Sequence, residues 1–275
     1  MTTESPTDNA SGNASKCAPP EASPVLRFLA VLGFLTRLAP GRVLSEADMR
    51  RSMFHMPLCG LALGLAVAAP TTALLWAGPL TGKPLVLAWL AVLLSAWFTR
   101  GLHLDGLADI CDGAAAHVNP ERFWSILKDS RVGTFGAAAV ALFFLGQATL
   151  LGEALRGQPP LWAGCTVAWA ILFGRMCGVL FGAAHRGLLR PGLGGLFLAG
   201  ANPTAVLWAL ALTLGPGLWL WPAATLAAVL CAGLLCLPLS RLGRAVGGIN
   251  GDFLGASILL GETAAALAMA LFPLA

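Results

Sequence analysis

The chain has 275 residues, of which 57% are hydrophobic and only 11% are charged. Soluble domains carry about 25% charged residues, so this composition excludes an ordinary soluble enzyme and a disordered protein. The formal net charge of +4 is too small to indicate a nucleic-acid partner. We therefore expect an all-α, polytopic membrane protein that is embedded in the lipid bilayer.

The first 38 residues divide into a polar and an apolar part. Residues 1–24 are rich in Ser, Thr, Pro and Asn and contain no apolar signal-peptide core, so we expect a disordered tail. Residues 25–38 are apolar but too short for a membrane span, which favours an interfacial or re-entrant helix. The remaining chain, 25–275, is expected to form a single membrane domain.

Long apolar runs predict about seven transmembrane helices. Most runs exceed the 17 residues or so that a span needs. The run at 204–215 is short, and Pro216-Gly217 separates it from the next as either a tight turn or a kink, so six spans is the alternative count. The expected spans lie near 53–77, 84–101, 134–152, 161–183, 204–215, 218–239 and 253–273.

Basic residues are distributed unevenly between the two sides of this predicted bundle. The side that includes 1–52, 102–133, 184–203 and 240–252 carries 15 of the 17 Lys and Arg residues when Arg100 and Arg175, near their span ends, are counted with it. The other side carries only Lys83 and Arg156. Cytoplasmic loops are enriched in Lys and Arg. We expect the first side to be cytoplasmic.

Acidic residues concentrate in the segment 102–133, which holds five of the chain's 13. On a helix, Asp105, Asp109 and Asp112 would share one face, where their like charges repel. A divalent cation with oxygen ligands would compensate them, and Mg²⁺ typically uses one or two carboxylates plus substrate phosphate oxygens. The alternative is a solvated acidic surface.

Two further loops on the same side have residues suited to phosphate. Lys128 and Arg131 could hold phosphate oxygens, and Ser130 could cap the helix that follows. The loop 241–252 contains four glycines, whose backbone N–H groups can cradle phosphate. Its last residue, Asp252, is either a helix cap or a further metal ligand.

Two charged residues lie inside predicted spans. Arg175 and Glu262 have matching depths of about 13 and 15 Å at 1.5 Å per residue. We expect them to face one another, or to share a polar cavity. Charges at this depth are costly and default to a functional role, although a structural ion pair is the alternative.

An acidic cluster, basic residues and a Gly-rich loop on one side favour Mg²⁺-dependent transfer of a phosphate-bearing group. The chain has no Walker A loop or Rossmann fingerprint and no nucleophile elbow. Direct in-line displacement at phosphorus is therefore the simplest mechanism. The residues alone do not identify the acceptor.

The sequence resembles the cobalamin synthases, the adenosylcobinamide-GDP ribazoletransferases. The resemblance runs from about residue 25 to 273 and rests mainly on two central motifs, with weaker similarity at each end. The matching segments are His103-Leu104-Asp105-Gly106-Leu107-Ala108-Asp109 with Asp112-Gly113, Lys128-Asp129-Ser130-Arg131-Val132-Gly133-Thr134-Phe135-Gly136, Phe34-Leu35-Thr36-Arg37-Leu38 and Gly251-Asp252-Phe253-Leu254-Gly255-Ala256.

This resemblance implies a bacterial inner-membrane enzyme of late cobalamin biosynthesis, acting alone, as a homo-oligomer or with other cobalamin-assembly enzymes. It would join adenosylcobinamide-GDP to α-ribazole or its 5′-phosphate and release GMP. It implies Mg²⁺ held by catalytic residues Asp105, Asp109, Asp112 and Asp129. Substrate-binding residues would be His103, Lys128, Ser130, Arg131, Arg175, Arg244, Asn250, Asp252 and Glu262.

Two other classes remain as alternatives. Asp109-x2-Asp112-Gly113 also resembles the start of the CDP-alcohol phosphotransferase motif, but the later part of that motif is missing. Arg175 and Glu262 would suit a transporter, but no inverted repeat of broken helices is evident.

Overall fold

The structure is a computed structural model that describes residues 22–115 and 119–273. Nearly all of the predicted disordered tail lies outside these residues. In the part described, the regular elements are all helical, and one isolated parallel bridge joins Leu189 to Ile249.

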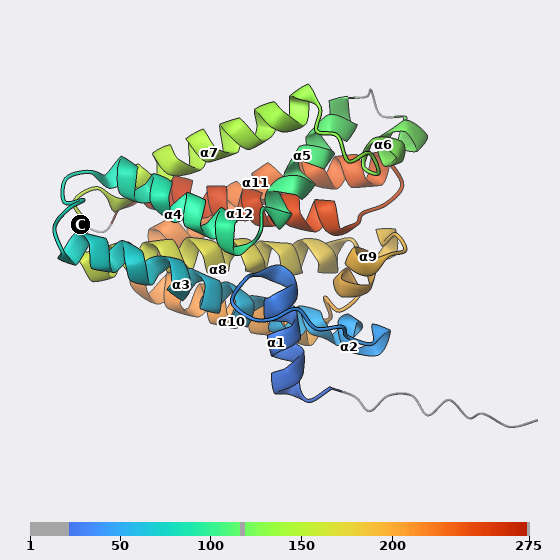
Figure 1. Ribbon diagram of the computed structural model, residues 1–275, viewed down its shortest axis with the longest axis horizontal. Helices are drawn as coiled ribbons and strands as arrows, with labels where there is room; N and C mark the ends of the chain where they lie inside the picture. The colour runs from blue at the N-terminus through green and yellow to red at the C-terminus, as the bar shows by residue number, and fades with distance from the viewer. Residues whose placement is uncertain (1–21, 116–118, 274–275) are drawn as a thin grey trace, which may run out of the picture.

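Seven long helices form the bundle in Figure 1. They are α3 (Met56–Trp76), α4 (Pro84–Phe98), α7 (Thr134–Leu155), α8 (Pro160–Ala184), α10 (Pro203–Leu220), α11 (Pro222–Ala245) and α12 (Gly251–Leu271). The shorter elements are α1 (Pro24–Leu35), α2 (Glu46–Arg51), η1 (Ser52–His55), α5 (Leu102–Ala115), α6 (Pro120–Ile126), η2 (Arg186–Leu188) and α9 (Leu193–Leu198).

The number of membrane spans agrees with the prediction. Six of the described helices are long and apolar enough to cross a bilayer, and α4 and α5 together make a seventh if a pair bent by 91° is counted as one broken span. The chain is therefore a polytopic helical membrane protein. Seven crossings place the end of α12 opposite the end of the bundle where α5, α6 and α9 gather.

Two predicted boundaries were wrong. The span expected to end near residue 239 continues as α11 to Ala245, so the predicted loop 241–252 begins inside this helix. The break expected at Pro216-Gly217 falls instead at Trp221, because α10 continues through Pro216 to Leu220. A proline inside a span is tolerated when neighbouring groups satisfy the backbone that it frees. The Trp169 indole donates a hydrogen bond at 3.0 Å to the Thr213 carbonyl, which is next to the Leu212 carbonyl that loses its helical donor to the proline.

The helices α8 and α12 form the centre of the bundle, and both are mostly buried. Glycines let their backbones approach closely, as small residues do between membrane helices. A Cβ added at Gly174 of α8 would lie 2.7 Å from the Ile258 carbonyl oxygen of α12. The last helix of the chain is therefore inserted among α5, α7, α8 and α11 rather than added at the edge.

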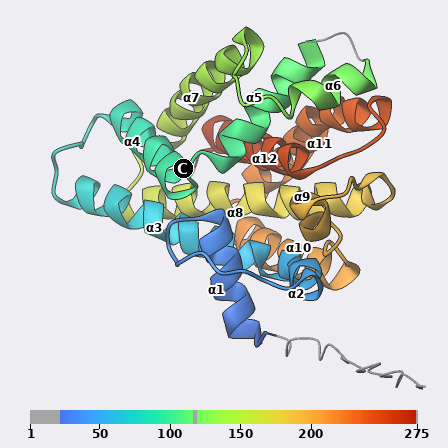
Figure 2. The same cartoon turned by 45° about the vertical axis from the view of Figure 1, so that its right-hand side comes forward.

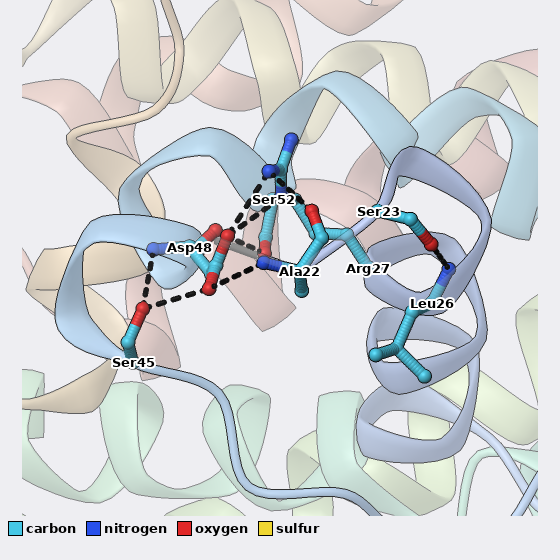
Figure 3. A network of polar contacts seen from close by, with 7 residues as sticks. All are labelled: Ala22, Ser23, Leu26, Arg27, Ser45, Asp48 and Ser52. Carbon is cyan, nitrogen blue, oxygen red and sulfur yellow. Dashed lines mark hydrogen bonds and ion pairs between the residues drawn. The ribbon is translucent and has the colours of Figure 1, made fainter. Parts of the chain in front are cut away.

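The short helix α1 lies across the long helices in both views (Figures 1 and 2), as expected of an interfacial helix. A polar network ties it to α2 (Figure 3). The Arg27 guanidinium donates to the buried Asp48 carboxylate at 3.0 Å, and Ser45 donates to the same carboxylate at 2.8 Å.

The turn between α4 and α5 is held by α1. The Arg100 guanidinium donates to the carbonyls of Gly33, Phe34 and Thr36 at the end of α1, at 2.6 to 3.0 Å. A cation at this position also favours the negative end of the helix dipole. Arg100 and Gly101 both have left-handed backbones, with φ of 55° and 71°, and this reverses the chain sharply enough to set the direction of α5.

Candidate functional site

The helix α5 crosses the first turns of α12 at very short range. A Cβ added at Gly106 would lie 2.9 Å from the Asp252 Cα, and one added at Gly255 would lie 3.1 Å from the His103 Cα. Only glycine allows this approach without a shift of one helix. The crossing brings the predicted acidic motif next to a residue almost 150 positions later in the chain.

Asp105, Asp109 and Asp252 form an acidic cluster at this crossing. The charges of Asp105, Asp252 and, to a smaller extent, Asp112 act on the Asp109 carboxylate, and the charge of Asp105 acts on Asp252. Asp105 is exposed, and the other two are partly exposed. Among the described residues, no Lys or Arg forms an ion pair with any of the three. Within the described residues, the negative charge of this cluster is therefore not compensated by an ion pair.

Asp112 is on the same predicted stripe but has a different environment. Its two carboxylate oxygens accept hydrogen bonds from the backbone N–H groups of Gly133 and Gly136, at 2.7 and 2.8 Å. These are free donors of the first turn of α7, so Asp112 caps that helix. The predicted cap, Ser130, was wrong: Gly133 is the N-cap residue of α7 and Ser130 is exposed. The unpaired N–H groups at the start of α7 are instead satisfied by Asp112, a side chain of α5.

Asp129 lies apart from the acidic cluster, in the connection between α6 and α7. Its carboxylate pairs with the Arg131 guanidinium at 2.6 Å, and both side chains are exposed. Hydrogen bonds from Arg131 lower the pKa of Asp129 to about 2. Lys128 is exposed beside them. This segment therefore presents two cations, one of which is already paired with a carboxylate.

Asn250 closes the Gly-rich loop and begins α12. Its side-chain oxygen accepts from the Asp252 backbone N–H at 3.2 Å, and its amide donates to the Asp252 carboxylate at 2.6 Å. Of the two roles predicted for Asp252, the cap is therefore wrong, because Asn250 caps the helix. Asp252 stays available to the acidic cluster, with its carboxylate held by Asn250.

Arg190 and Trp124 join three segments beside the cluster, and neither was among the predicted site residues. The Arg190 guanidinium lies 4.1 Å from the centre of the Trp124 ring, a cation–π contact. The Trp124 indole donates to the Val246 carbonyl at 2.9 Å, and the Arg190 N–H donates to the Ile249 carbonyl at 2.9 Å. The basic loop 185–190 was visible in the sequence, but nothing in the spacing indicated Trp124. The exposed Arg244 lies in the last turn of α11, just before the Gly-rich connection.

The predicted meeting of Arg175 and Glu262 is confirmed. They form an ion pair deep in the bundle, where Arg175 is 3% and Glu262 5% exposed. Arg175 also donates to the Ile171 carbonyl at 3.1 Å. His103 is buried as well, at the start of α5. These three residues lie inside the bundle rather than on the surface of the acidic cluster.

The donor set suits a metal that takes part of its coordination from a substrate. Within the described residues, no three His, Cys, Asp or Glu side chains are arranged as a complete metal site. The acidic cluster nevertheless offers oxygen ligands alone, with uncompensated charge. Mg²⁺ is usually held by one or two carboxylates together with water and phosphate oxygens, and the cluster fits that mode.

Fold and site together define a helical membrane protein with an acidic site at one end of its bundle, assembled from α5 and α12. Residues 27–270 match the family model described as cobalamin-5-phosphate synthase. The chain belongs to this family, as the motifs predicted.

Named relatives agree with the family model. An adenosylcobinamide-GDP ribazoletransferase of Nitratidesulfovibrio vulgaris strain Miyazaki F is 41% identical over 86% of this chain and 91% of its own length. The corresponding protein of Klebsiella pneumoniae strain 342 is 38% identical over 88% and 98%. That of Geotalea daltonii is 37% identical over 79% and 85%. No solved structure matches the chain.

Proposed function

We propose that this chain is an adenosylcobinamide-GDP ribazoletransferase of late cobalamin biosynthesis. It joins adenosylcobinamide-GDP to α-ribazole, or to α-ribazole 5′-phosphate, and releases GMP. Family membership and the names of the relatives support the reaction. The single structural observation that carries it is the uncompensated acidic cluster of Asp105, Asp109 and Asp252.

The chemistry is a phosphoryl-type displacement. The 5′-hydroxyl of the acceptor attacks the phosphorus nearer to cobinamide, a new P–O bond forms, and the bond to the GMP phosphate breaks as the hydroxyl loses its proton. Catalysis of this kind is mostly positioning and charge stabilisation. Mg²⁺ supplies positive charge to the phosphate oxygens when bound. Asp105 and Asp109 would hold the ion, Asp252 would add a third carboxylate beside them, and Asn250 keeps Asp252 in place.

Asp112 and Asp129 take different parts in this proposal. Asp112 fixes the start of α7 against α5, and so sets the position of the connection that carries Lys128 and Arg131. Asp129 orients Arg131 by its ion pair. Lys128, Arg131 and Arg244 then surround the site with cations that bind the pyrophosphate, with Arg in bidentate fashion.

The location follows from the same layout. We place the enzyme in a bacterial inner membrane with the acidic cluster facing the cytoplasm, because the end that carries the cluster also carries most of the Lys and Arg residues. Nucleotide substrates are then reached from the side on which they are made.

A reconstituted reaction tests the proposal. Detergent-purified protein is given adenosylcobinamide-GDP with α-ribazole or with its 5′-phosphate, and GMP and the corrinoid product are followed by chromatography with and without Mg²⁺. We expect Mg²⁺-dependent product, and a loss on the order of 100-fold in Asp109→Asn, as for removal of one group that stabilises transition-state charge.

Glu121→Gln is the matched control, because Glu121 is an exposed acid of α6 outside the cluster and its variant should keep full activity. The two acceptors identify the natural substrate by their kcat/KM values. Folded wild-type protein that forms no product from either acceptor would refute the proposed reaction. Full activity in Asp109→Asn would refute the acidic cluster as the site.

A further inference from the structure

An apolar slot of about 370 Å³ lies between α8, α10 and α11, away from the acidic cluster. Its volume is in the range of sites that hold small molecules, about 300–1,000 Å³. The deep end is lined by Phe173, Leu214 and Val229, and the other end by His185 and Ser240. Val229 and Leu237 of its wall are 42% and 43% exposed, so the slot reaches the outer, lipid-facing surface.

The length of the slot matches one leaflet of a bilayer. Residues 173–184 of α8 and residues 229–240 of α11 line it and run in the same direction towards the end of the bundle where the acidic cluster lies. Eleven residues of helix rise about 17 Å. Half of the hydrocarbon core measures about 15 Å. An extended acyl chain would therefore fill the slot from the membrane surface to the midplane.

His185 places an unsatisfied polar atom in the wall of the slot. The side chain is only 5% exposed, and its Nε2 has no hydrogen-bond partner. The other ring nitrogen, Nδ1, lies 2.8 Å from the Phe181 carbonyl oxygen. A carbonyl only accepts, so Nδ1 carries the hydrogen, and in this tautomer Nε2 is the acceptor. A buried acceptor without a donor is costly, so the occupant of the slot should supply a hydroxyl or an ammonium group.

Two arginines next to the polar end of the slot favour a hydroxyl over an ammonium group in the headgroup. Arg186 follows His185 directly and Arg241 follows Ser240, and both arginines are exposed. In the described residues neither forms an ion pair with a carboxylate. Two exposed cations, each next in sequence to a residue that lines the slot, complement an anionic phosphate with an apolar tail. An anionic headgroup that also carries hydroxyl donors satisfies both the arginines and His185.

We propose that this slot is a binding site for one anionic glycerophospholipid with hydroxyls in its headgroup, that is, a phosphatidylglycerol. One acyl chain lies between α8, α10 and α11. The headgroup hydroxyl donates to His185 Nε2, and the phosphate meets Arg186 and Arg241. The site is separate from the acidic cluster and does not depend on the reaction proposed above.

Native mass spectrometry of the purified protein, after incubation with phosphatidylglycerol, phosphatidylethanolamine or phosphatidylcholine, tests the proposal. We expect one phosphatidylglycerol to be retained more strongly than either other lipid. Gly233→Leu fills the slot from its wall, where an added Cβ meets nothing within 4 Å, and should abolish this retention. Gly146→Leu on the lipid-facing helix α7, where an added Cβ is equally free, is the matched control and should retain the lipid.

The double variant Arg186→Gln/Arg241→Gln tests the headgroup. It should weaken phosphatidylglycerol binding by about tenfold, as expected for loss of charge-assisted hydrogen bonds, while leaving phosphatidylcholine unaffected. Each variant is first checked for an unchanged melting temperature. Equal adducts in wild type, Gly233→Leu and Gly146→Leu would show non-specific annular lipid and overturn the site. A preference for phosphatidylethanolamine would overturn the proposed headgroup.

Discussion

Asp109 and Asp112 lie three residues apart on α5, yet they face different neighbours. Asp109 is among carboxylates, whereas Asp112 accepts two backbone N–H groups of α7. The second environment stabilises a carboxylate without any metal, through hydrogen bonds and the positive end of the helix dipole. The capping role of Asp112 can therefore be tested through stability, separately from catalysis.

Replacing Asp112 by alanine should lower the free energy of unfolding by about 0.5–2 kcal/mol, the usual cost of losing a helix cap. Asp112→Asn should recover part of the loss, because an amide oxygen can accept one of the two hydrogen bonds. Thermal unfolding in detergent measures both variants. Equal melting temperatures for wild type and Asp112→Ala would contradict the capping role.

The ion pair of Arg175 and Glu262 allows a second test at a single residue. Glu262→Gln leaves a buried, uncompensated guanidinium and should destabilise the protein by about 3–5 kcal/mol. The double variant Arg175→Met/Glu262→Met removes both charges and should restore most of that stability. If the pair also binds substrate, the double variant will be stable but will show a raised KM in the GMP-release assay. If the pair is structural alone, the KM will not change.

The packing of whole helices also depends on single residues: α5 and α12 can cross closely only because Gly106 and Gly255 lie at the contact. The two helices bring together Asp105, Asp109 and Asp252 only because their backbones nearly touch. The elbow at Arg100 and Gly101 aims α5 at this crossing, and α1 fixes the elbow through its terminal carbonyls. A small change in either contact therefore moves the carboxylates relative to each other.

Gly106→Ala should destabilise the protein by about 1–3 kcal/mol, as overpacking does, and should reduce kcat by separating the carboxylates. Gly146→Ala is the matched control: its added Cβ meets nothing, and alanine is the better helix former by about 1 kcal/mol. We expect its stability to stay constant or to rise. Unfolding curves and GMP release are measured on both variants. An active and stable Gly106→Ala would show that the close approach is not required.

The helices were predictable from the sequence because each apolar run must satisfy its backbone internally within a membrane. The elbow at Gly101 also fell near the predicted end of a span. The break at Trp221 was missed because Pro216 was given too much weight: a proline can stand inside a membrane helix, and α10 continues through it to Leu220. Asp105, Asp109 and Asp252 were all named as candidates. The sequence did not show that Asp112 caps α7 or that Asp129 pairs with Arg131, because both are contacts that only the folded structure reveals. Trp124 acts through a tertiary contact that no local pattern reveals.

At the scale of the whole molecule, the uneven distribution of charge predicts orientation. Glu121→Cys lies at the end with the acidic cluster, and Lys83→Cys lies at the opposite end, in the connection between α3 and α4. In intact cells, a membrane-impermeant maleimide should label Lys83→Cys and leave Glu121→Cys unlabelled until the cells are opened. The unsubstituted protein gives the background from the native cysteines. Labelling of Glu121→Cys alone in intact cells would reverse the proposed orientation.

The central position of α12 has a consequence for biogenesis. This helix leaves the ribosome after all the other described helices, yet it contacts α5, α7, α8 and α11 and supplies both Asp252 and Glu262. The earlier helices therefore enter the membrane before the central helix is made, and until then Arg175 has no Glu262 to pair with. A nascent chain arrested before residue 251 has neither a complete carboxylate set nor a neutral interior. Only a polypeptide that includes α12 can therefore have both the complete carboxylate set and the packed, charge-paired interior.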